Sequence, residues 1–243
     1  ATHTVADITA QRITPAALEM MDNLTLKAVE EATHAGYPID AAAVLLIELE
    51  GLKESVEVQA EKIREVCLTN HAREVRLARS EEERELLWRG RKNAFGALGR
   101  ISPSFYVQDG VIPRTRLPEM LELIEGVGRK YDLRIGNVFH AGDGNLHPLL
   151  LFDARDRKES ANVLKAAKEI MNACVAMGGS ISGEHGIGLE KNELLPLIFS
   201  GDDIDAMRKV KDAFGKGGNL NPGKLFPTGK MCGELRVQVS AGG

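Results

Sequence analysis

The sequence lacks several features that would define a protein class. It has no basic excess, with 31 Lys and Arg against 35 Asp and Glu, whereas a nucleic-acid-binding domain usually carries a basic face. No apolar run approaches the ~20 residues that cross a membrane, and no signal-peptide pattern is present. Its cysteines, Cys67, Cys174 and Cys232, are too few and too far apart for a disulfide framework or a zinc ribbon. We therefore expect a cytoplasmic protein with inert thiols, no nucleic-acid partner and no membrane span.

Two nucleotide-binding motifs are also missing. No Gly-x-Gly-x-x-Gly run follows a strand and opens a helix, and there is no phosphate-binding P-loop. A dinucleotide fold is therefore not supported by these residues. The hydrophobic content of 43% and charged content of 27% are those of an ordinary globular protein.

Hydrophobic periodicity and turn signals predict alternating helices and strands. A segment at 13–21 reads as a strand or as the start of a helix. Further strands are expected at 41–50, 74–78, 104–112, 134–141 and 146–152, and helices at 24–35, 54–69, 81–98, 117–131, 155–177, 189–199 and 202–214. This order predicts one α+β domain over residues 1–243, with ferredoxin-like halves and helices packed on one side of a mainly antiparallel sheet.

The run Val138-Phe-His-Ala-Gly-Asp-Gly-Asn-Leu-His147 is the most informative feature that is present. An Asp-Gly pair between apolar runs is a strong signal for a hairpin with a two-residue turn. With Asp143 and Gly144 as that turn, His140 and His147 would lie opposite each other, with Cβ atoms roughly 5 Å apart. Both imidazoles could then reach one metal ion. The alternative is a hairpin with two incidental histidines.

A second cluster, Gly183-Glu-His-Gly-Ile-Gly188, follows a short β-prone run. Its glycines suit a loop whose backbone approaches another group closely. Glu184 could add a carboxylate to the two histidines, with His185 beside the ion as a base, since neighbouring side chains of extended backbone point in opposite directions. Two histidines and one carboxylate leave coordination positions open, as a catalytic site requires. The alternative is a tight turn with a solvated tip.

These two runs, together with Leu220-Asn-Pro-Gly-Lys224 and Trp88-Arg-Gly-Arg-Lys-Asn-Ala-Phe95, resemble the C-terminal domain of FAD-linked oxidases of the vanillyl-alcohol-oxidase group. The likeness is greatest to the glycolate oxidase flavin subunits, with D-lactate and D-2-hydroxyglutarate dehydrogenases as relatives. It implies oxidation of a small 2-hydroxy acid to the 2-oxo acid by hydride transfer to flavin. It also implies a separate N-terminal FAD-binding domain that is missing from this chain, so that the chain alone would be inactive.

The resemblance assigns roles to particular residues. His140, His147 and Glu184 match metal ligands, for zinc or manganese, and His185 matches the base. Arg91 matches the arginine that binds the substrate carboxylate, although from composition alone it reads as a solvated helix charge. Asn145 and Lys224 match contacts to the cofactor, where a turn residue and a surface lysine are the plain alternatives.

The positions near Arg91 suggest the kind of substrate. Phe95 and Val107 provide no second cation or hydroxyl there, which favours a monocarboxylate such as glycolate or lactate. Other oxidase subunits, including an iron–sulfur subunit, are expected partners. Two other functions remain open: a stand-alone metal hydrolase using the same His-His-Glu site, and a non-catalytic interaction module.

Overall fold

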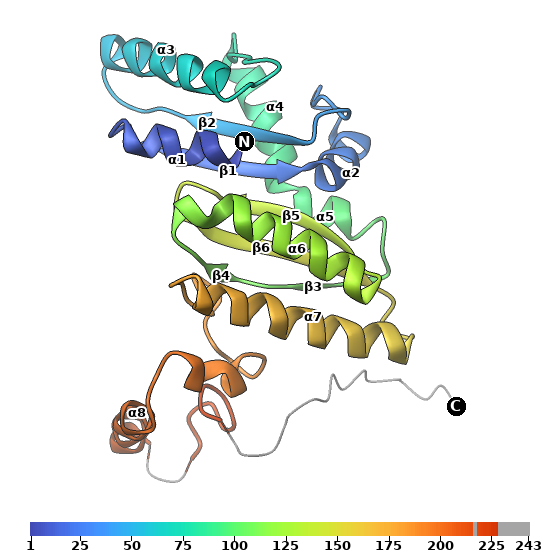
Figure 1. The fold of residues 1–243 in the computed structure, drawn as a ribbon, viewed down its shortest axis with the longest axis vertical. Helices are drawn as coiled ribbons and strands as arrows, with labels where there is room; N and C mark the ends of the chain where they lie inside the picture. The colour runs from blue at the N-terminus through green and yellow to red at the C-terminus, as the bar shows by residue number, and fades with distance from the viewer. Residues whose placement is uncertain (216–217, 228–243) are drawn as a thin grey trace.

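One antiparallel sheet organises the chain, and the computed structural model describes residues 1–215 and 218–227 of it (Figure 1). The sheet order is β2-β1-β5-β6-β3, and the short β4 also pairs with β6. Every strand pairing that the described residues form is antiparallel. The strands are β1 (Ala17–Asp22), β2 (Ala43–Glu48), β3 (Ser104–Val107), β4 (Gly110–Val111), β5 (Arg134–His140) and β6 (Asn145–Phe152).

Helices precede, connect and follow these strands. They are α1 (Thr2–Ala10), α2 (Asn23–Thr33), α3 (Lys53–Thr69), α4 (Glu81–Lys92), α5 (Ala94–Leu98), α6 (Leu117–Tyr131), α7 (Arg157–Ala176) and α8 (Gly201–Phe214), with 3-10 turns η1 (Arg114–Arg116) and η2 (Asn192–Leu197). Side-chain caps fix several helix starts, including Asp22 for α2 and the expected Ser80 for α4. Such caps satisfy amide groups that have no partner inside the helix.

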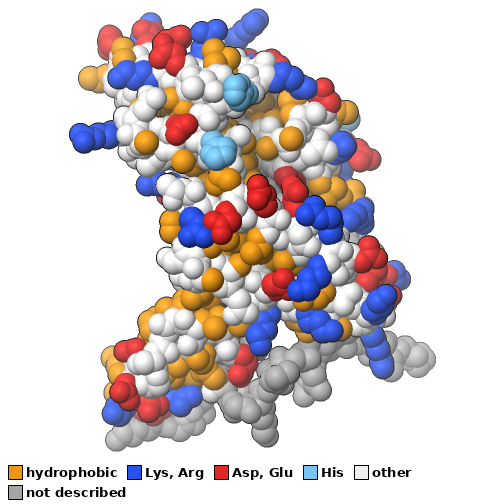
Figure 2. Space-filling view, viewed as in Figure 1, with side chains coloured by type: hydrophobic (Ala, Val, Ile, Leu, Met, Phe, Trp, Pro, Cys, Tyr) orange, Lys and Arg blue, Asp and Glu red, His pale blue; other side chains and the backbone are white. Residues whose placement is uncertain are grey.

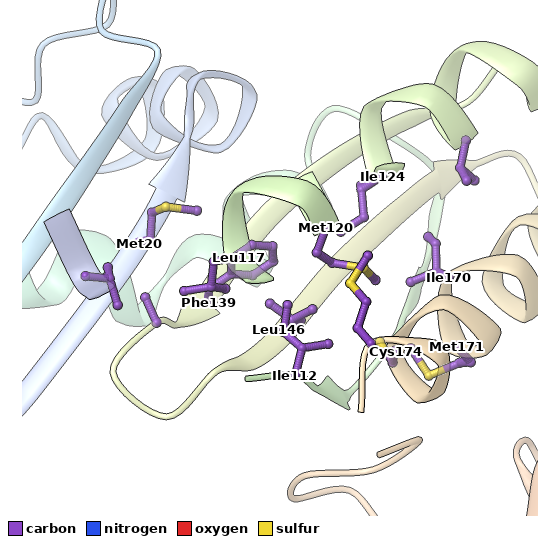
Figure 3. Close-up of a cluster of buried hydrophobic side chains, with 14 of the residues drawn as sticks. Met20, Ile112, Leu117, Met120, Ile124, Phe139, Leu146, Ile170, Met171 and Cys174 are labelled. Atoms are coloured by element: carbon purple, nitrogen blue, oxygen red, sulfur yellow. The ribbon is translucent and has the colours of Figure 1, made fainter. Parts of the chain in front are cut away.

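Two hydrophobic clusters lie on opposite faces of the sheet, because side chains of a strand alternate between its faces. Leu150 of β6 belongs to the larger cluster, which packs under α1, α3, α6 and α7. Its neighbours Leu149 and Leu151 belong to the second cluster, formed with α2 and α5. Figure 3 shows the centre of the larger cluster, where Phe139 and Leu146 meet side chains of α6 and α7.

The α+β class and the antiparallel sheet are confirmed, with one correction to the packing: helices cover both faces of the sheet rather than one. The segment at 13–21 contains a strand, β1, which begins only at Ala17, whereas α1 was not expected. The strand expected at 74–78 is wrong, because that segment pairs with no strand and leaves Leu77 63% exposed. The strand expected at 104–112 is interrupted at Gln108 and Asp109.

The last described part of the chain forms a separate small lobe below α7 in Figure 1. It contains η2 and α8 around a small cluster of Leu195, Ile204 and Phe226. Cys67 and Cys174 are buried free thiols, as expected, and Cys232 lies outside the described residues. No helix in the described ranges is long and apolar enough to span a bilayer.

Candidate metal site and its surroundings

The β5–β6 hairpin brings His140 and His147 together, but in a different register from the expected one. His140 pairs with Asn145, and His147 pairs with Val138. The connection is therefore the four-residue loop 141–144 rather than a two-residue turn. Contacts outside the hairpin hold this loop, since the Gly142 amide donates to Leu18 and the Gly144 carbonyl accepts from Ile112.

The correction is a shift of two residues, and a shift of two leaves every side chain on its face of the strand. The two histidines therefore still share a face, as diagonal rather than direct neighbours, and their ring centroids are 5.2 Å apart. The predicted juxtaposition is confirmed although the predicted register is wrong.

Glu184 completes a three-residue group. One ligand atom from each of His140, His147 and Glu184 lies within 4.8 Å of the others. The His140 Nε2 atom is 3.5 Å from Glu184 Oε1, and the His147 Nε2 atom is 3.9 Å from Glu184 Oε2. Gly183 is needed for this approach, because a Cβ atom there would lie 2.8 Å from the Asn145 side chain.

The second ring nitrogen of each histidine, Nδ1, already has a hydrogen-bond partner. His140 Nδ1 is 2.8 Å from a Glu19 carboxylate oxygen, and His147 Nδ1 is 3.3 Å from the Gln108 carbonyl. In each case an Nδ1–H donor fixes the tautomer and leaves Nε2 free as a ligand, an arrangement typical of metal-binding histidines. The donor set therefore fits a divalent ion that accepts nitrogen and oxygen ligands.

The surroundings of the two histidines shift their pKa values in opposite directions. The hydrogen bond to Glu19 raises the pKa of His140, while burial lowers the pKa of His147. Burial alone would raise the pKa of Glu19, but its hydrogen bond with His140 and the nearby Arg91 charge outweigh burial and lower it. Glu19 is thus an anion that links His140, a candidate ligand, to the Arg91 guanidinium.

His185 lies beside this group, as expected from the sequence. Its ring is nearly parallel to that of His147, with centroids 5.0 Å apart and an angle of 8° between the planes. His185 and Glu184 are both exposed, whereas His147 is 2% exposed and also contacts the Phe95 ring edge-on. The imidazole of His185 therefore faces solvent next to the candidate ligands.

Of the other expected site residues, Arg91 and Asn145 bond to Glu19 and Glu184, whereas Lys224 lies in the C-terminal lobe. Arg91 binds Glu19 through an Nη2–Oε2 contact of 2.6 Å, and both side chains are 11% exposed. Asn145 donates from Nδ2 to Glu184 at 3.0 Å, and its buried Oδ1 has no partner among the described residues. Lys224 is exposed in the C-terminal lobe, where its backbone amide bonds Asn221.

Sequence reasoning missed Glu19, Asp109 and Lys191. Each is a charged residue that the fold buries, at 8%, 0% and 4% exposure. The available signal was an acid inside a predicted apolar strand, as in Leu-Glu-Met-Met and Val-Gln-Asp-Gly. A buried charge needs a partner, so such an acid points to a cation or donor from elsewhere in the chain.

Known proteins resemble this chain in sequence and in fold. The family "FAD linked oxidases, C-terminal domain" matches residues 1–225. The chain is 51% identical over 231 residues to the glycolate oxidase subunit GlcD of Escherichia coli strain K12, covering 95% of this chain and 46% of that protein. It is 41% identical to GlcD of Bacillus subtilis, covering 93% and 48%. A probable mitochondrial D-lactate dehydrogenase of Danio rerio is 30% identical, with 87% and 42% covered.

The chain thus spans about half the length of the curated relatives it matches. Among solved structures, 4-ethylphenol oxidase from Gulosibacter chungangensis in an isoeugenol complex aligns with a TM-score of 0.62 and 15% identity, over 93% of this chain and 52% of that one. Substrate-bound p-cresol methylhydroxylase aligns with a TM-score of 0.62 and 12% identity, over 94% and 51%. At these identities the likeness establishes the fold alone.

Proposed function

The chain belongs to the FAD linked oxidases as a C-terminal domain of that family, and from this we propose that it is the substrate- and metal-binding part of an FAD-dependent oxidoreductase. We propose a small 2-hydroxy acid as the substrate and the 2-oxo acid as the product. Residues 1–243 would form one domain, and an N-terminal FAD-binding domain would complete the enzyme. The observation that carries the proposal is the convergence of His140, His147 and Glu184 beside the exposed ring of His185.

His140, His147 and Glu184 would hold a divalent ion, zinc or manganese. Such an ion supplies positive charge that lowers the pKa of a bound substrate hydroxyl. We propose that His185 accepts the hydroxyl proton, because an imidazole next to the ligands can act as a general base near neutral pH. FAD would accept the α-hydrogen with its electron pair.

Arg91 is the proposed partner of the substrate carboxylate. Its guanidinium is held in place by Glu19, and a guanidinium whose orientation is fixed can form two parallel hydrogen bonds with a carboxylate. Phe95, whose ring lies 6.2 Å from the His147 ring, and Val107 carry neither a cation nor a hydroxyl. We therefore favour glycolate or D-lactate over a dicarboxylic hydroxy acid.

Two residues are proposed to contact the cofactor. The buried and unpartnered Oδ1 of Asn145 would accept a hydrogen bond from the flavin or the substrate, since an unpaired buried acceptor is costly. Lys224 lies in a turn of the C-terminal lobe, and this lobe is joined to the loop that follows Glu184 by a Leu225–Gly188 backbone hydrogen bond. The role of Lys224 remains a prediction.

The C-terminal lobe also supports the proposed second domain. Hydrophobic side chains gather on this lobe in Figure 2. Its exposed apolar residues are Leu189, Leu197, Ile198, Val210, Phe214, Leu220 and Leu225. Exposed apolar surface of this kind often marks an interaction site. Because two relatives are named as oxidase subunits, we also propose that the enzyme assembles with other subunits, an iron–sulfur subunit among them.

Substrate-dependent bleaching of the flavin absorption band tests the proposal. The full-length enzyme that contains this chain, loaded with FAD and zinc or manganese, is mixed anaerobically with glycolate, D-lactate or a dicarboxylic hydroxy acid. We expect bleaching by a monocarboxylate, and its loss in Arg91→Met. Arg89→Met is the matched control, because Arg89 lies on the same helix and is exposed. Hydrolytic activity without flavin, and no bleaching by any hydroxy acid, would favour the metal hydrolase instead.

A further inference from the structure

We propose that Asp109 is a positioning residue that sets Glu184 and His185 relative to His147. Asp109 touches no proposed ligand atom, and it acts through the backbone of the loop that carries two of the site residues. The inference rests on the proposed function, since it assigns a role toward the metal site. On this proposal, the two residues between β3 and β4, Gln108 and Asp109, align the two halves of the site.

The Asp109 carboxylate accepts hydrogen bonds from four consecutive residues of the loop, 182–185. It accepts the backbone N–H groups of Gly183 at 3.0 Å, Glu184 at 3.2 Å and His185 at 2.9 Å. The Ser182 hydroxyl donates to Oδ2 at 2.7 Å. Hydrogen bonds to an ionised acceptor are stronger than neutral ones. Three successive amides directed at one carboxylate therefore fix the backbone from which the Glu184 and His185 side chains project.

The preceding residue fixes the other half of the site. The Gln108 carbonyl is 3.3 Å from His147 Nδ1, and the Gln108 amide donates to the Pro148 carbonyl at 3.0 Å. The strands on either side, β3 and β4, both pair with β6. Gln108 and Asp109 are therefore anchored over the strand that carries His147, and a shift of this segment would move both halves of the site.

Lys191 compensates the buried charge of Asp109. Its Nζ atom donates to the Asp109 carbonyl at 2.8 Å and to Oδ2 at 3.3 Å. Burial alone would raise the pKa of Asp109, but the hydrogen bonds and Lys191 hold it well below the ordinary range. Asparagine has the same size but only one acceptor oxygen, and its NH₂ group would face donors. The donor count at this position thus requires a carboxylate.

Asp109→Asn in this chain tests the inference by two readouts. Without metal, hydrogen exchange of the Gly183, Glu184 and His185 amides should accelerate at least tenfold. With metal, affinity for Zn²⁺ should fall by roughly 10–100-fold, the usual effect of losing an outer partner of a metal ligand, and the visible spectrum of the Co²⁺-loaded chain should change. The control is Asp153→Asn, because Asp153 accepts an amide and pairs with Arg155 just beyond the opposite end of β6.

A double variant separates positioning from general stability. In Asp109→Asn/Lys191→Met both buried charges are gone, so the unfolding midpoint should recover toward that of the wild type while the metal affinity stays weak. This variant also carries the test if the single variant does not fold. Unchanged amide exchange, or metal affinity that recovers together with stability, would overturn the proposal. Failure of the wild-type chain to bind Zn²⁺ or Mn²⁺ would refute the metal site alone, and amide exchange would still decide the role of Asp109.

Discussion

Replacing Glu19 with glutamine should destabilise the chain more than any surface carboxylate would. Glu19 pairs with Arg91 through side chains that are each 11% exposed, and it also binds His140. Removing one partner of a buried ion pair costs roughly 3–5 kcal/mol, because the other charge stays buried without compensation. Glutamine keeps the size and one acceptor, so we expect about 3 kcal/mol, at the lower end of that range. For a chain of this length, that is a fall of roughly 6–12 °C in the midpoint of thermal unfolding.

Urea unfolding measures this effect directly. Trp88 is the only tryptophan of the chain and lies on α4 one turn before Arg91, so its fluorescence reports on this region, while circular dichroism reports on the whole fold. Glu119→Gln is the matched control, since Glu119 pairs with Arg116 on the surface at 55% and 41% exposure, where solvent screening leaves such a pair little effect on stability. Equal losses in the two variants would refute the argument that Glu19 neutralises a buried charge.

Three further predictions concern the site and the strand that supports it. His185→Asn should leave Zn²⁺ affinity within about threefold while lowering substrate oxidation by the full-length enzyme by roughly 10²–10⁴-fold, the usual contribution of a general base; retained turnover would exclude His185 as that base. Because Glu19 raises the pKa of His140 above 6.5, protonation of His140 stabilises the metal-free chain below about pH 6.5, and this contribution is lost as pH rises through the raised value. Zn²⁺ affinity, measured by competition titration, should rise over the same interval, since the ligand must be deprotonated; a flat profile would contradict this. Gly179→Ala should destabilise the chain by roughly 1–3 kcal/mol, as measured by urea unfolding, because the added Cβ would overlap the Val111 carbonyl. The control Gly201→Ala has open space around the added Cβ and should change stability by less than about 0.5 kcal/mol.

Most helices and strands could be predicted from the sequence because local signals, such as caps and apolar periodicity, mark where they lie. Ser80 begins α4 as a cap, and the apolar stripe of 117–131 forms α6 as expected. The predictions that were wrong concern segments whose structure depends on tertiary contacts. The segment at 74–78 has strand-like composition but finds no partner strand, and the strand expected at 104–112 breaks where Asp109 turns toward the loop 182–185. Local propensity contains no information about such partners.

The candidate site divides in the same way. His140 and His147 could be placed together because strand periodicity preserves the face even when the register is wrong by two residues. Glu184 could be added only by its chemistry, since no local rule brings the loop at 183–188 to the hairpin. The sequence marks Glu19 and Asp109 only as acids within predicted strands, and it does not name their partners, which lie 121 residues away in one case and 74–76 in the other.

The exposure of the site residues bears on what the chain can do alone. The side chains of His140 and Glu184 are 33% and 54% exposed, so solvent reaches the group from one side, while Glu19, Gln108 and Asp109 hold it from the buried side. Hydrogen transfer to a flavin benefits from a site that excludes water, because electrostatic interactions weaken in a high dielectric. In the proposed enzyme the described residues would supply one half of the site, with its open side facing outward. That geometry is what a separate flavin-bearing domain would cover, and it is why we expect metal binding, but not turnover, from this chain by itself.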